Sequence, residues 1–153
     1  MVVLKNIPSI ISPELLYALA QMGHGDEIVL ADANFPSSSI CKSGPILIRA
    51  DGNDIPGLLK AILTLLPLDT YVDQPAVVMQ LVDSDAQRQL KTPVWEIYKE
   101  MLTEAEGRQI ELRKVERFKF YDRARTAFAV VATGEKALYG NLILKKGVIS
   151  SSQ

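Results

Sequence analysis

Short apolar runs alternate with amphipathic segments along this chain, and this alternation constrains its fold more than any other feature. The run EIVLA at 27–31 is too short and too rich in β-branched residues for a helix. AVVMQLV at 76–82 and AFAVVAT at 127–133 have the length and apolar character of further strands. Continuously apolar strands lie in sheets that helices cover on both sides. The sequence therefore predicts an α/β fold, a single domain with three layers in the order α/β/α.

Helix signals separate these runs. Ser12, Pro13 and Glu14 make a good helix start, because serine caps the first turn, proline suits it and the acid complements the helix dipole. Gly23 is a natural end for that helix. We expect one domain over 1–148 and a disordered tail at 149–153. The other expectations are helices at 54–66, 92–107 and 117–125, strands at 46–50 and 110–115, a loop at 34–39, and NLILKKG at 141–147 closing the fold.

Charge and cysteine content exclude several classes of partner. A net charge of −1 over 153 residues leaves no electrostatic footprint for nucleic acid. The single cysteine, Cys41, excludes an internal disulfide and a cysteine-based zinc cluster, and it favours a reducing compartment. No apolar run approaches the roughly 20 residues that span a bilayer. These observations predict a soluble cytoplasmic protein that binds neither nucleic acid nor membrane.

The only histidine of the chain, His24, stands between Gly23 and Gly25 in the stretch QMGHGDEIVLADANFP. One interpretation is a tight turn between a helix and a strand, in which an isolated histidine is simply exposed. The other is a catalytic imidazole, because the glycines let a substrate come close and Asp26 and Glu27 can tune the ring. Histidine is also the natural proton carrier at neutral pH. Composition favours the turn, whereas the context favours the catalytic interpretation.

Asp32 directly follows the apolar run at 27–31, where the predicted strand ends. In open α/β sheets, ligands bind beyond the carboxyl ends of the strands, and an acid at that position can bind hydroxyl groups. The alternative is a turn cap, because Ala33 and Asn34 can begin a turn. The sequence supports these two interpretations equally.

The spacing of His24 and Asp32 sets a geometric condition on any shared site. At about 3.3 Å per residue, an extended segment from 24 to 32 would separate them by more than ~20 Å. For both to serve one small ligand, the glycine turn must fold back, or one of the two must come from a neighbouring subunit. We therefore expect a site close to, or across, a subunit interface.

A third group of polar side chains falls late in the chain, with Arg117 and Tyr121 in one segment and Tyr139, Gly140 and Asn141 in another. Their guanidinium, phenol and amide groups together donate and accept hydrogen bonds, as recognition of a polyhydroxylated sugar requires. Taken one at a time, each is more commonly structural, as an arginine on a solvated helix face or an aromatic in a strand. Their combination nevertheless favours a sugar-binding site.

Other signals are weaker or missing. Asp69 and Tyr71, in the loop after Pro67, are further candidates for binding a polar ligand. The chain has no GxGxxG, P-loop or GxSxG motif, and one histidine without a second thiol does not make a transition-metal site. What remains is cofactor-free proton transfer on a small polar ligand, or binding without chemistry.

Several segments together resemble a known family: ISPELLYALAQMGHGDEIVLADANFP at 11–36, IRADG at 48–52, ERFKFYDRARTAFAVVATGE at 116–135 and LYGNLILKKG at 138–147. They are similar to the fucose mutarotase and ribose pyranase family of sugar-ring enzymes, and most closely to its fucose mutarotase branch. The resemblance implies a mixed sheet in an α/β/α fold and a homo-oligomer. Bacterial members form ring-shaped decamers with active sites near subunit contacts. The implied activity interconverts the α and β anomers of a free monosaccharide, with no metal or nucleotide.

The resemblance also assigns roles to the candidate residues. His24 corresponds to the family's proposed proton donor, and Tyr121 is a second candidate for proton transfer. The residues expected to bind the sugar are Asp32, Arg117, Tyr139 and Asn141, with Gly140 between the last two and Asp69 as a further candidate.

We therefore expect an isomerase that acts on free L-fucose, with galactose and ribose as further candidate substrates. It is expected to work without a cofactor and as a homo-oligomer, either a dimer or a decamer. Two alternatives stay open at this point. One is ribose pyranase-type interconversion of six- and five-membered rings, and the other is a non-catalytic module that binds a monosaccharide.

Overall fold

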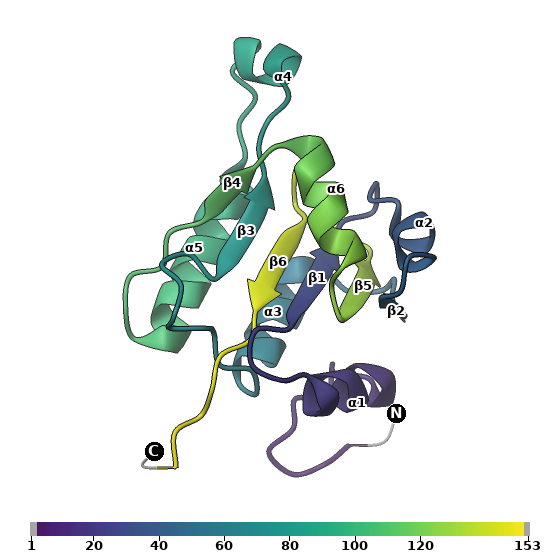
Figure 1. Cartoon of the computed structure of the whole chain (residues 1–153), viewed down its shortest axis with the longest axis vertical. Helices are drawn as coiled ribbons and strands as arrows, with labels where there is room; N and C mark the ends of the chain where they lie inside the picture. The colour runs from purple at the N-terminus through teal and green to yellow at the C-terminus, as the bar shows by residue number, and fades with distance from the viewer. Residues whose placement is uncertain (1–2, 152–153) are drawn as a thin grey trace.

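A six-stranded mixed sheet forms the centre of the computed structural model, which describes residues 3–151 (Figure 1). Its strands follow the spatial order β2-β5-β1-β6-β3-β4. The pairs β1–β5, β2–β5 and β3–β4 are parallel, whereas β6 is antiparallel to both of its neighbours, β1 and β3. The strands are β1 Glu27–Ala31, β2 Ile46–Ala50, β3 Ala76–Met79, β4 Arg113–Val115, β5 Ala129–Thr133 and β6 Leu142–Lys145.

These pairings point the first five strands in the same direction. Their carboxyl ends therefore meet at one edge of the sheet, which we call the carboxyl edge, together with the beginning of β6. Their amino ends and the end of β6 lie at the opposite, amino edge, where Glu27 pairs with Lys145. Residues that precede β1 and residues that follow it are thus held at opposite ends of the molecule.

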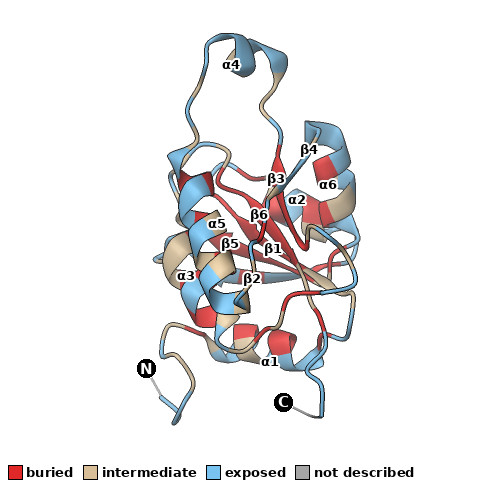
Figure 2. Ribbon diagram, turned by 90° about the vertical axis from the view of Figure 1, so that its left-hand side faces the viewer, coloured by how far each residue is buried: buried red, intermediate tan, exposed pale blue. Residues whose placement is uncertain are grey.

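Helices cover both faces of the sheet, which confirms the predicted α/β/α layers (Figure 2). Side chains of α1, α3 and α5 pack on one face, and side chains of α2 and α6 pack on the other. Tyr98 of α5 and Phe120 of α6 are among the largest fully buried side chains, one in each layer. The helices are α1 Pro13–Gln21, α2 Ser37–Cys41, α3 Ile55–Leu63, α4 Asp83–Gln87, α5 Pro93–Glu106 and α6 Arg117–Arg125.

The apolar run of β1 explains why the sheet needs both layers. Ile28 and Leu30 belong to the core under α1, α3 and α5, while Val29 and Ala31 belong to the core under α2 and α6. All four are fully buried. At about 25 cal/mol per Å² of apolar surface removed from water, exposing either face of such a strand would cost several kcal/mol.

Most predicted elements are confirmed, and the differences concern short elements. Ser12 caps α1 as expected, since its Oγ accepts a hydrogen bond from the Leu15 N–H at 3.1 Å. The loop expected at 34–39 is wrong in part, because α2 begins at residue 37. The helix α4 was not expected, and the strands expected at 76–82 and 110–115 cover only Ala76–Met79 and Arg113–Val115. Five-residue helices contain too few turns to show an apolar period.

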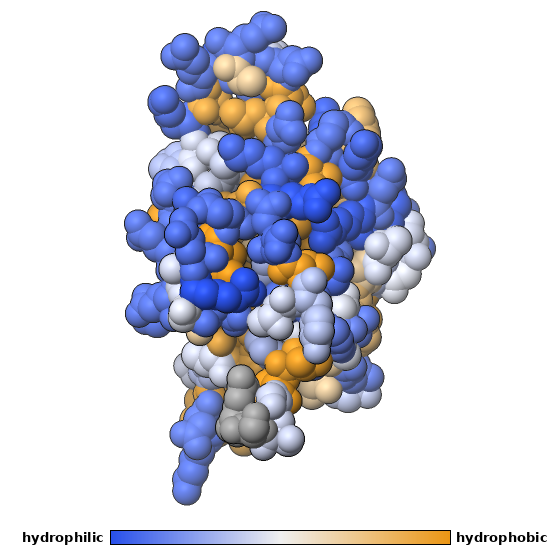
Figure 3. Space-filling model, turned by 60° about the vertical axis from the view of Figure 1, so that its left-hand side comes forward, coloured by the Kyte–Doolittle hydropathy of each residue, from blue (hydrophilic) through white to orange (hydrophobic). Residues whose placement is uncertain are grey.

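Residues 80–92 form an arm that carries α4 beyond the rest of the domain (Figure 1). No residue of α4 is buried. On the face shown in Figure 3, hydrophilic side chains cover the tip of the arm and apolar ones appear below it. The arm therefore contributes little to the core, and polar contacts with Tyr139, made by Val82 and by Asp85 of α4, link it to the rest of the domain.

Two expectations concern the ends of the chain and membranes. Of the tail expected at 149–153, residues 152–153 lie outside the described part of the chain. None of the helices within residues 3–151 has the length and apolar character needed to cross a bilayer.

Gly134 is a point of close backbone approach that we expect to be intolerant of any side chain. Its N–H donates to the Asn53 carbonyl at 2.9 Å, and an added Cβ would clash with the Asp51 carbonyl oxygen. Gly134→Ala should lower the free energy of unfolding by about 1–3 kcal/mol, measured by urea denaturation. Gly52→Ala is the matched control, because a Cβ there meets nothing within 4 Å. Equal stabilities of the two variants would contradict this packing.

Candidate active site

A pocket of about 330 Å³ lies at the carboxyl edge of the sheet, and we call it the carboxyl-edge pocket. It has the size of a small-ligand site. Asp32 reaches it from just beyond the end of β1, two residues reach it from α6, and three from the segment before β6. It brings together five of the residues predicted from the sequence: Asp32, Arg117, Tyr121, Tyr139 and Asn141.

Asp32 is buried and held by backbone donors on both carboxylate oxygens. Its Oδ1 accepts from the Asn34 N–H at 3.0 Å, and its Oδ2 accepts from the Gly140 N–H at 3.2 Å. Its own N–H donates to Oδ1 of Asn141 at 2.7 Å. Burial raises the pKa of Asp32 above its ordinary value, although these backbone donors oppose the shift. The two interpretations of Asp32 therefore coexist, since the residue caps a turn and also lines the pocket.

Two side chains of α5 fix the backbone carbonyls of Tyr139 and Gly140. Tyr139 has a φ of 57°, a left-handed conformation that a bulky residue rarely adopts. Trp95 Nε1–H donates to the Tyr139 carbonyl at 2.8 Å, and the Tyr98 hydroxyl donates to the Gly140 carbonyl at 2.7 Å. A Cβ on Gly140 would lie only 2.9 Å from the Ala137 carbonyl oxygen. Helix α5 thus holds this strained segment, whose Gly140 N–H bonds to Asp32.

Arg117 and Tyr121 are one turn apart on α6 and face each other. Arg117 Nε lies 3.4 Å from the Tyr121 hydroxyl, and this contact raises the pKa of the guanidinium further above its ordinary value. The guanidinium also lies 5.3 Å from the centroid of the Phe118 ring. The Tyr121 ring packs edge-on against Phe35 at 5.6 Å. The first turns of α6 therefore present a cation and a phenol to the pocket.

The arm contributes a residue that the sequence analysis missed. Asp85 lines the pocket, and its Oδ2 accepts from the Tyr139 hydroxyl at 2.6 Å. The Val82 N–H donates to the same hydroxyl at 3.2 Å. The hydrogen bonds from Tyr139 and Arg88 lower the pKa of Asp85, while burial and the Asp85 contact raise the pKa of Tyr139. The position of Asp85 shortly after an apolar strand was the one signal that could have found it.

His24 and Asp69 lie elsewhere, at the amino edge. Nε2 of His24 is 3.0 Å from Oδ1 of Asp69, and their side chains are 43% and 3% exposed. The His24 ring also lies 5.1 Å from the ring of Tyr71. Burial alone would raise the pKa of Asp69, but the Tyr71 N–H and His24 overcome it, so this pKa lies below its ordinary value. A buried carboxylate thus orients a half-exposed imidazole.

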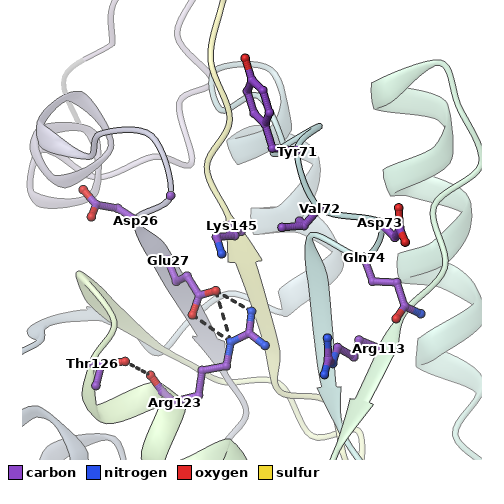
Figure 4. A pocket seen from close by; sticks show the side chains of 11 residues that line it. Asp26, Glu27, Tyr71, Val72, Asp73, Gln74, Arg113, Arg123, Thr126 and Lys145 are labelled. Atoms are coloured by element: carbon purple, nitrogen blue, oxygen red, sulfur yellow. Dashed lines mark hydrogen bonds and ion pairs between the residues drawn. The ribbon is translucent and has the colours of Figure 1, made fainter.

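A second, larger cavity of about 720 Å³ adjoins this pair, and we call it the amino-edge cavity (Figure 4). Gly25 and Tyr71, the neighbours of His24 and Asp69, line it. Arg123 is turned toward Glu27, and its Nη2 lies 2.5 Å from Oε2 of that residue. The charged residues around the cavity balance in number: Arg113, Arg123 and Lys145 against Asp26, Glu27 and Asp73.

Within one chain, the catalytic candidate His24 and the carboxyl-edge pocket are too far apart to share a ligand. The five residue steps from Glu27 to Asp32 alone span about 16 Å. The glycine turn does not fold back, because the Gly25 N–H donates to the Lys146 carbonyl at 2.8 Å and fixes the turn at the amino edge. The first of the two geometric alternatives is therefore excluded.

The side chains also bear on metal binding. Nowhere in residues 3–151 do three His, Cys, Asp or Glu side chains gather as ligands of one metal ion would. The polar groups that meet in the carboxyl-edge pocket are instead two carboxyls, a guanidinium, two phenols and two amides. This donor and acceptor set suits a neutral, polyhydroxylated molecule.

Fold and pocket together define a single-domain α/β protein with a pocket of small-ligand size, lined by polar side chains, at the carboxyl edge of its sheet. The RbsD / FucU transport protein family model matches residues 5–149, which is nearly the whole chain. The chain belongs to this family, and the family relationship expected from the sequence is confirmed.

Individual relatives match over almost their full length. A fucose mutarotase from Homo sapiens is 67% identical over 150 residues, which cover 98% of this chain and 97% of the human protein. The crystal structure of FucU from Bifidobacterium longum is 49% identical with a TM-score of 0.90, and the match covers 95% of this chain and 100% of that one. The fucose mutarotase from Streptococcus pneumoniae, crystallised with L-fucose, is 47% identical with a TM-score of 0.86, covering 96% of this chain and 100% of that one.

The lowered pKa of Asp69 makes a prediction about acid stability. An acid whose pKa is lower in the folded than in the unfolded chain stabilises the fold above its unfolded pKa, about 3.9, and loses this effect as pH falls through the folded pKa. We expect Asp69→Asn to lower the free energy of unfolding most near neutral pH. The difference in stability between the wild type and the variant should become smaller below about pH 4. Urea denaturation of both proteins across this range measures it. A difference in stability that does not change with pH would contradict a stabilising effect of the Asp69 charge.

Proposed function

We propose that this protein is an L-fucose mutarotase, an isomerase that interconverts the α and β anomers of the free sugar. The observation that carries the proposal is the meeting, in the carboxyl-edge pocket, of four side chains predicted to bind the sugar with Tyr121, which was predicted to transfer a proton. It is supported by the 67% identity to a human fucose mutarotase and by the 47% identity to a fucose mutarotase crystallised with L-fucose.

Mutarotation opens the cyclic hemiacetal, rotates the freed aldehyde carbon and closes the ring on its other face. Opening requires a proton delivered to the ring oxygen and another removed from the anomeric hydroxyl, and closure reverses both transfers. A positioned acid and a positioned base each contribute typically about 10²–10⁴-fold. The mechanism that we propose uses side chains of the protein alone, with no covalent intermediate.

The carboxyl-edge pocket holds the sugar in this proposal. Asp32 accepts from sugar hydroxyls with the lone pairs that its backbone donors leave, and Arg117 donates to a ring substituent. Asn141 uses its Oδ1 for the Asp32 N–H, so we assign its Nδ2 to a sugar oxygen. Tyr121 is the proton-transfer group in this pocket. Tyr139 lies beside them and keeps a hydroxyl near the ligand.

His24 is the second proton carrier, and we propose that it reaches the pocket of a neighbouring copy. Its side chain is 43% exposed at the amino edge, where its own chain offers no sugar pocket of this composition. Asp69 holds the imidazole in one orientation through the 3.0 Å contact. A homo-oligomer that apposes the amino edge of one copy to the carboxyl edge of the next would complete each site from two chains.

The assembly and its setting complete the proposal. The partners are a monosaccharide and further copies of this chain. The single free cysteine, Cys41, suits the reducing cytoplasm. A ring of copies or a dimer would both satisfy the two-chain site, since either symmetry can appose two different edges.

Saturation-transfer proton NMR on equilibrated L-fucose tests the proposed function. One anomeric proton is irradiated, and transfer to the other anomer is measured with and without protein in matched buffer, because buffers also catalyse mutarotation. Transfer that grows with protein concentration is the expected result. Binding without transfer would instead favour the non-catalytic module, and faster exchange on ribose than on fucose would favour the pyranase-type activity.

Removing either proposed proton carrier should abolish most of the catalysed exchange. We expect His24→Ala and Tyr121→Phe each to reduce the exchange rate by about 10²-fold, with unchanged circular dichroism spectra. Tyr17→Phe is the matched control, because Tyr17 is 66% exposed on α1 and lines neither described cavity. Wild-type exchange in His24→Ala would remove that residue from the mechanism.

Mixing the two inactive variants tests the two-chain site. In assemblies reassembled from equal amounts of His24→Ala and Tyr121→Phe, about a quarter of the sites would combine an intact amino edge with an intact carboxyl edge. Exchange should therefore recover to about a quarter of the wild-type rate. A mixture of Tyr121→Phe and Arg117→Ala should recover none, because both changes fall in the same pocket. Equal recovery, or no recovery, in both mixtures would contradict the proposed arrangement.

A further inference from the structure

The carboxyl-edge pocket has an apolar part that the proposed proton transfers leave unexplained. Phe35, Met79, Val82 and Leu138 line it beside the polar residues. Phe35 and Met79 are 8% and 6% exposed and belong to the core under α2 and α6. Their apolar character is therefore explained by folding alone. Val82 is half-buried.

Leu138 differs from Phe35 and Met79 in both exposure and packing. Leu138 is 53% exposed, and it belongs to neither core cluster. It immediately precedes Tyr139, whose strained backbone is fixed by the Trp95 hydrogen bond to its carbonyl. A leucine that is exposed in this pocket and held on a fixed segment is positioned for a ligand with an apolar group.

L-fucose carries such a group, because it is the 6-deoxy form of L-galactose and has a methyl at C6. We propose that Leu138 contacts this methyl and is a specificity-determining residue of the pocket. The inference rests on the proposed function. It goes beyond that function in assigning the choice between a methyl and a hydroxymethyl substituent to one side chain.

Two physical effects give Leu138 this selectivity. Burying a methyl against an apolar surface is favourable, and one such group in an apolar pocket changes kcat/KM by about 10–200-fold. A hydroxyl at C6 would instead lose hydrogen bonds to water without gaining a partner from leucine. Because Leu138 is half exposed, we expect its contact with the methyl to change kcat/KM by about tenfold, the lower end of this range.

Three sugars separate these effects, since they share the same configuration at C2, C3 and C4. D-arabinose has a hydrogen where L-fucose has its methyl, and L-galactose has a hydroxymethyl group there. Anomer exchange is measured by saturation-transfer NMR for all three with the wild type, Leu138→Ser and Leu138→Met. Ile97→Ser is the matched control, because Ile97 is 45% exposed on α5 and lines neither described cavity.

The wild type should prefer L-fucose over both other sugars. Leu138→Ser should lower kcat/KM for L-fucose about tenfold while leaving D-arabinose nearly unchanged, and Leu138→Met should retain most of the preference. Ile97→Ser should behave as the wild type does.

Other outcomes overturn the inference in distinguishable ways. Exchange of none of the sugars by the wild type would refute the proposed function and the inference with it. Exchange of L-fucose with a sugar preference that Leu138→Ser does not change would refute the inference alone. Equal losses on all three sugars, with altered sedimentation of Leu138→Ser, would assign Leu138 to a contact between copies instead.

Discussion

The antiparallel strand β6, inserted between β1 and β3, is the constraint on which the rest of this structure depends. Its pairing of Leu30 with Leu142 brings the segment before β6 to the carboxyl end of β1. A parallel strand at this position would begin at the amino edge and carry Tyr139 and Asn141 away from Asp32. The reversed direction of one central strand therefore creates the pocket, and the hydrogen bond between the Asp32 N–H and Asn141 Oδ1 closes it.

The pocket is rigid because both helical layers support it. On one side, Trp95 and Tyr98 of α5 donate hydrogen bonds to carbonyls of the segment before β6. On the other, Phe35 lies between the fully buried Phe120 and the pocket residue Tyr121. The active-site candidates are thus extensions of the two cores, and the aligned positions that proton transfer requires come from packing.

Much of this arrangement could be predicted from the sequence, because it rests on local signals. The apolar run at 27–31 predicted a buried strand, and the acid at its end made Asp32 a candidate either for ligand binding or for a turn cap. The features that local signals could not predict depend on contacts between residues far apart in the sequence. The contact of His24 with Asp69 joins positions 45 residues apart, and strand order decides it. Asp85 and Leu138 lie on segments without an apolar period, so periodicity did not single them out.

The position of the His24–Asp69 pair at the amino edge has a consequence for how sequences in this family vary. Under the two-chain site, residues of the amino edge meet the carboxyl-edge pocket only between copies, so selection acts on them jointly although they never touch within one chain. Co-varying positions at the two edges would then record contacts between copies. Used as distance restraints on a single chain, such pairs would pull together two ends of a sheet that β1 holds about 16 Å apart.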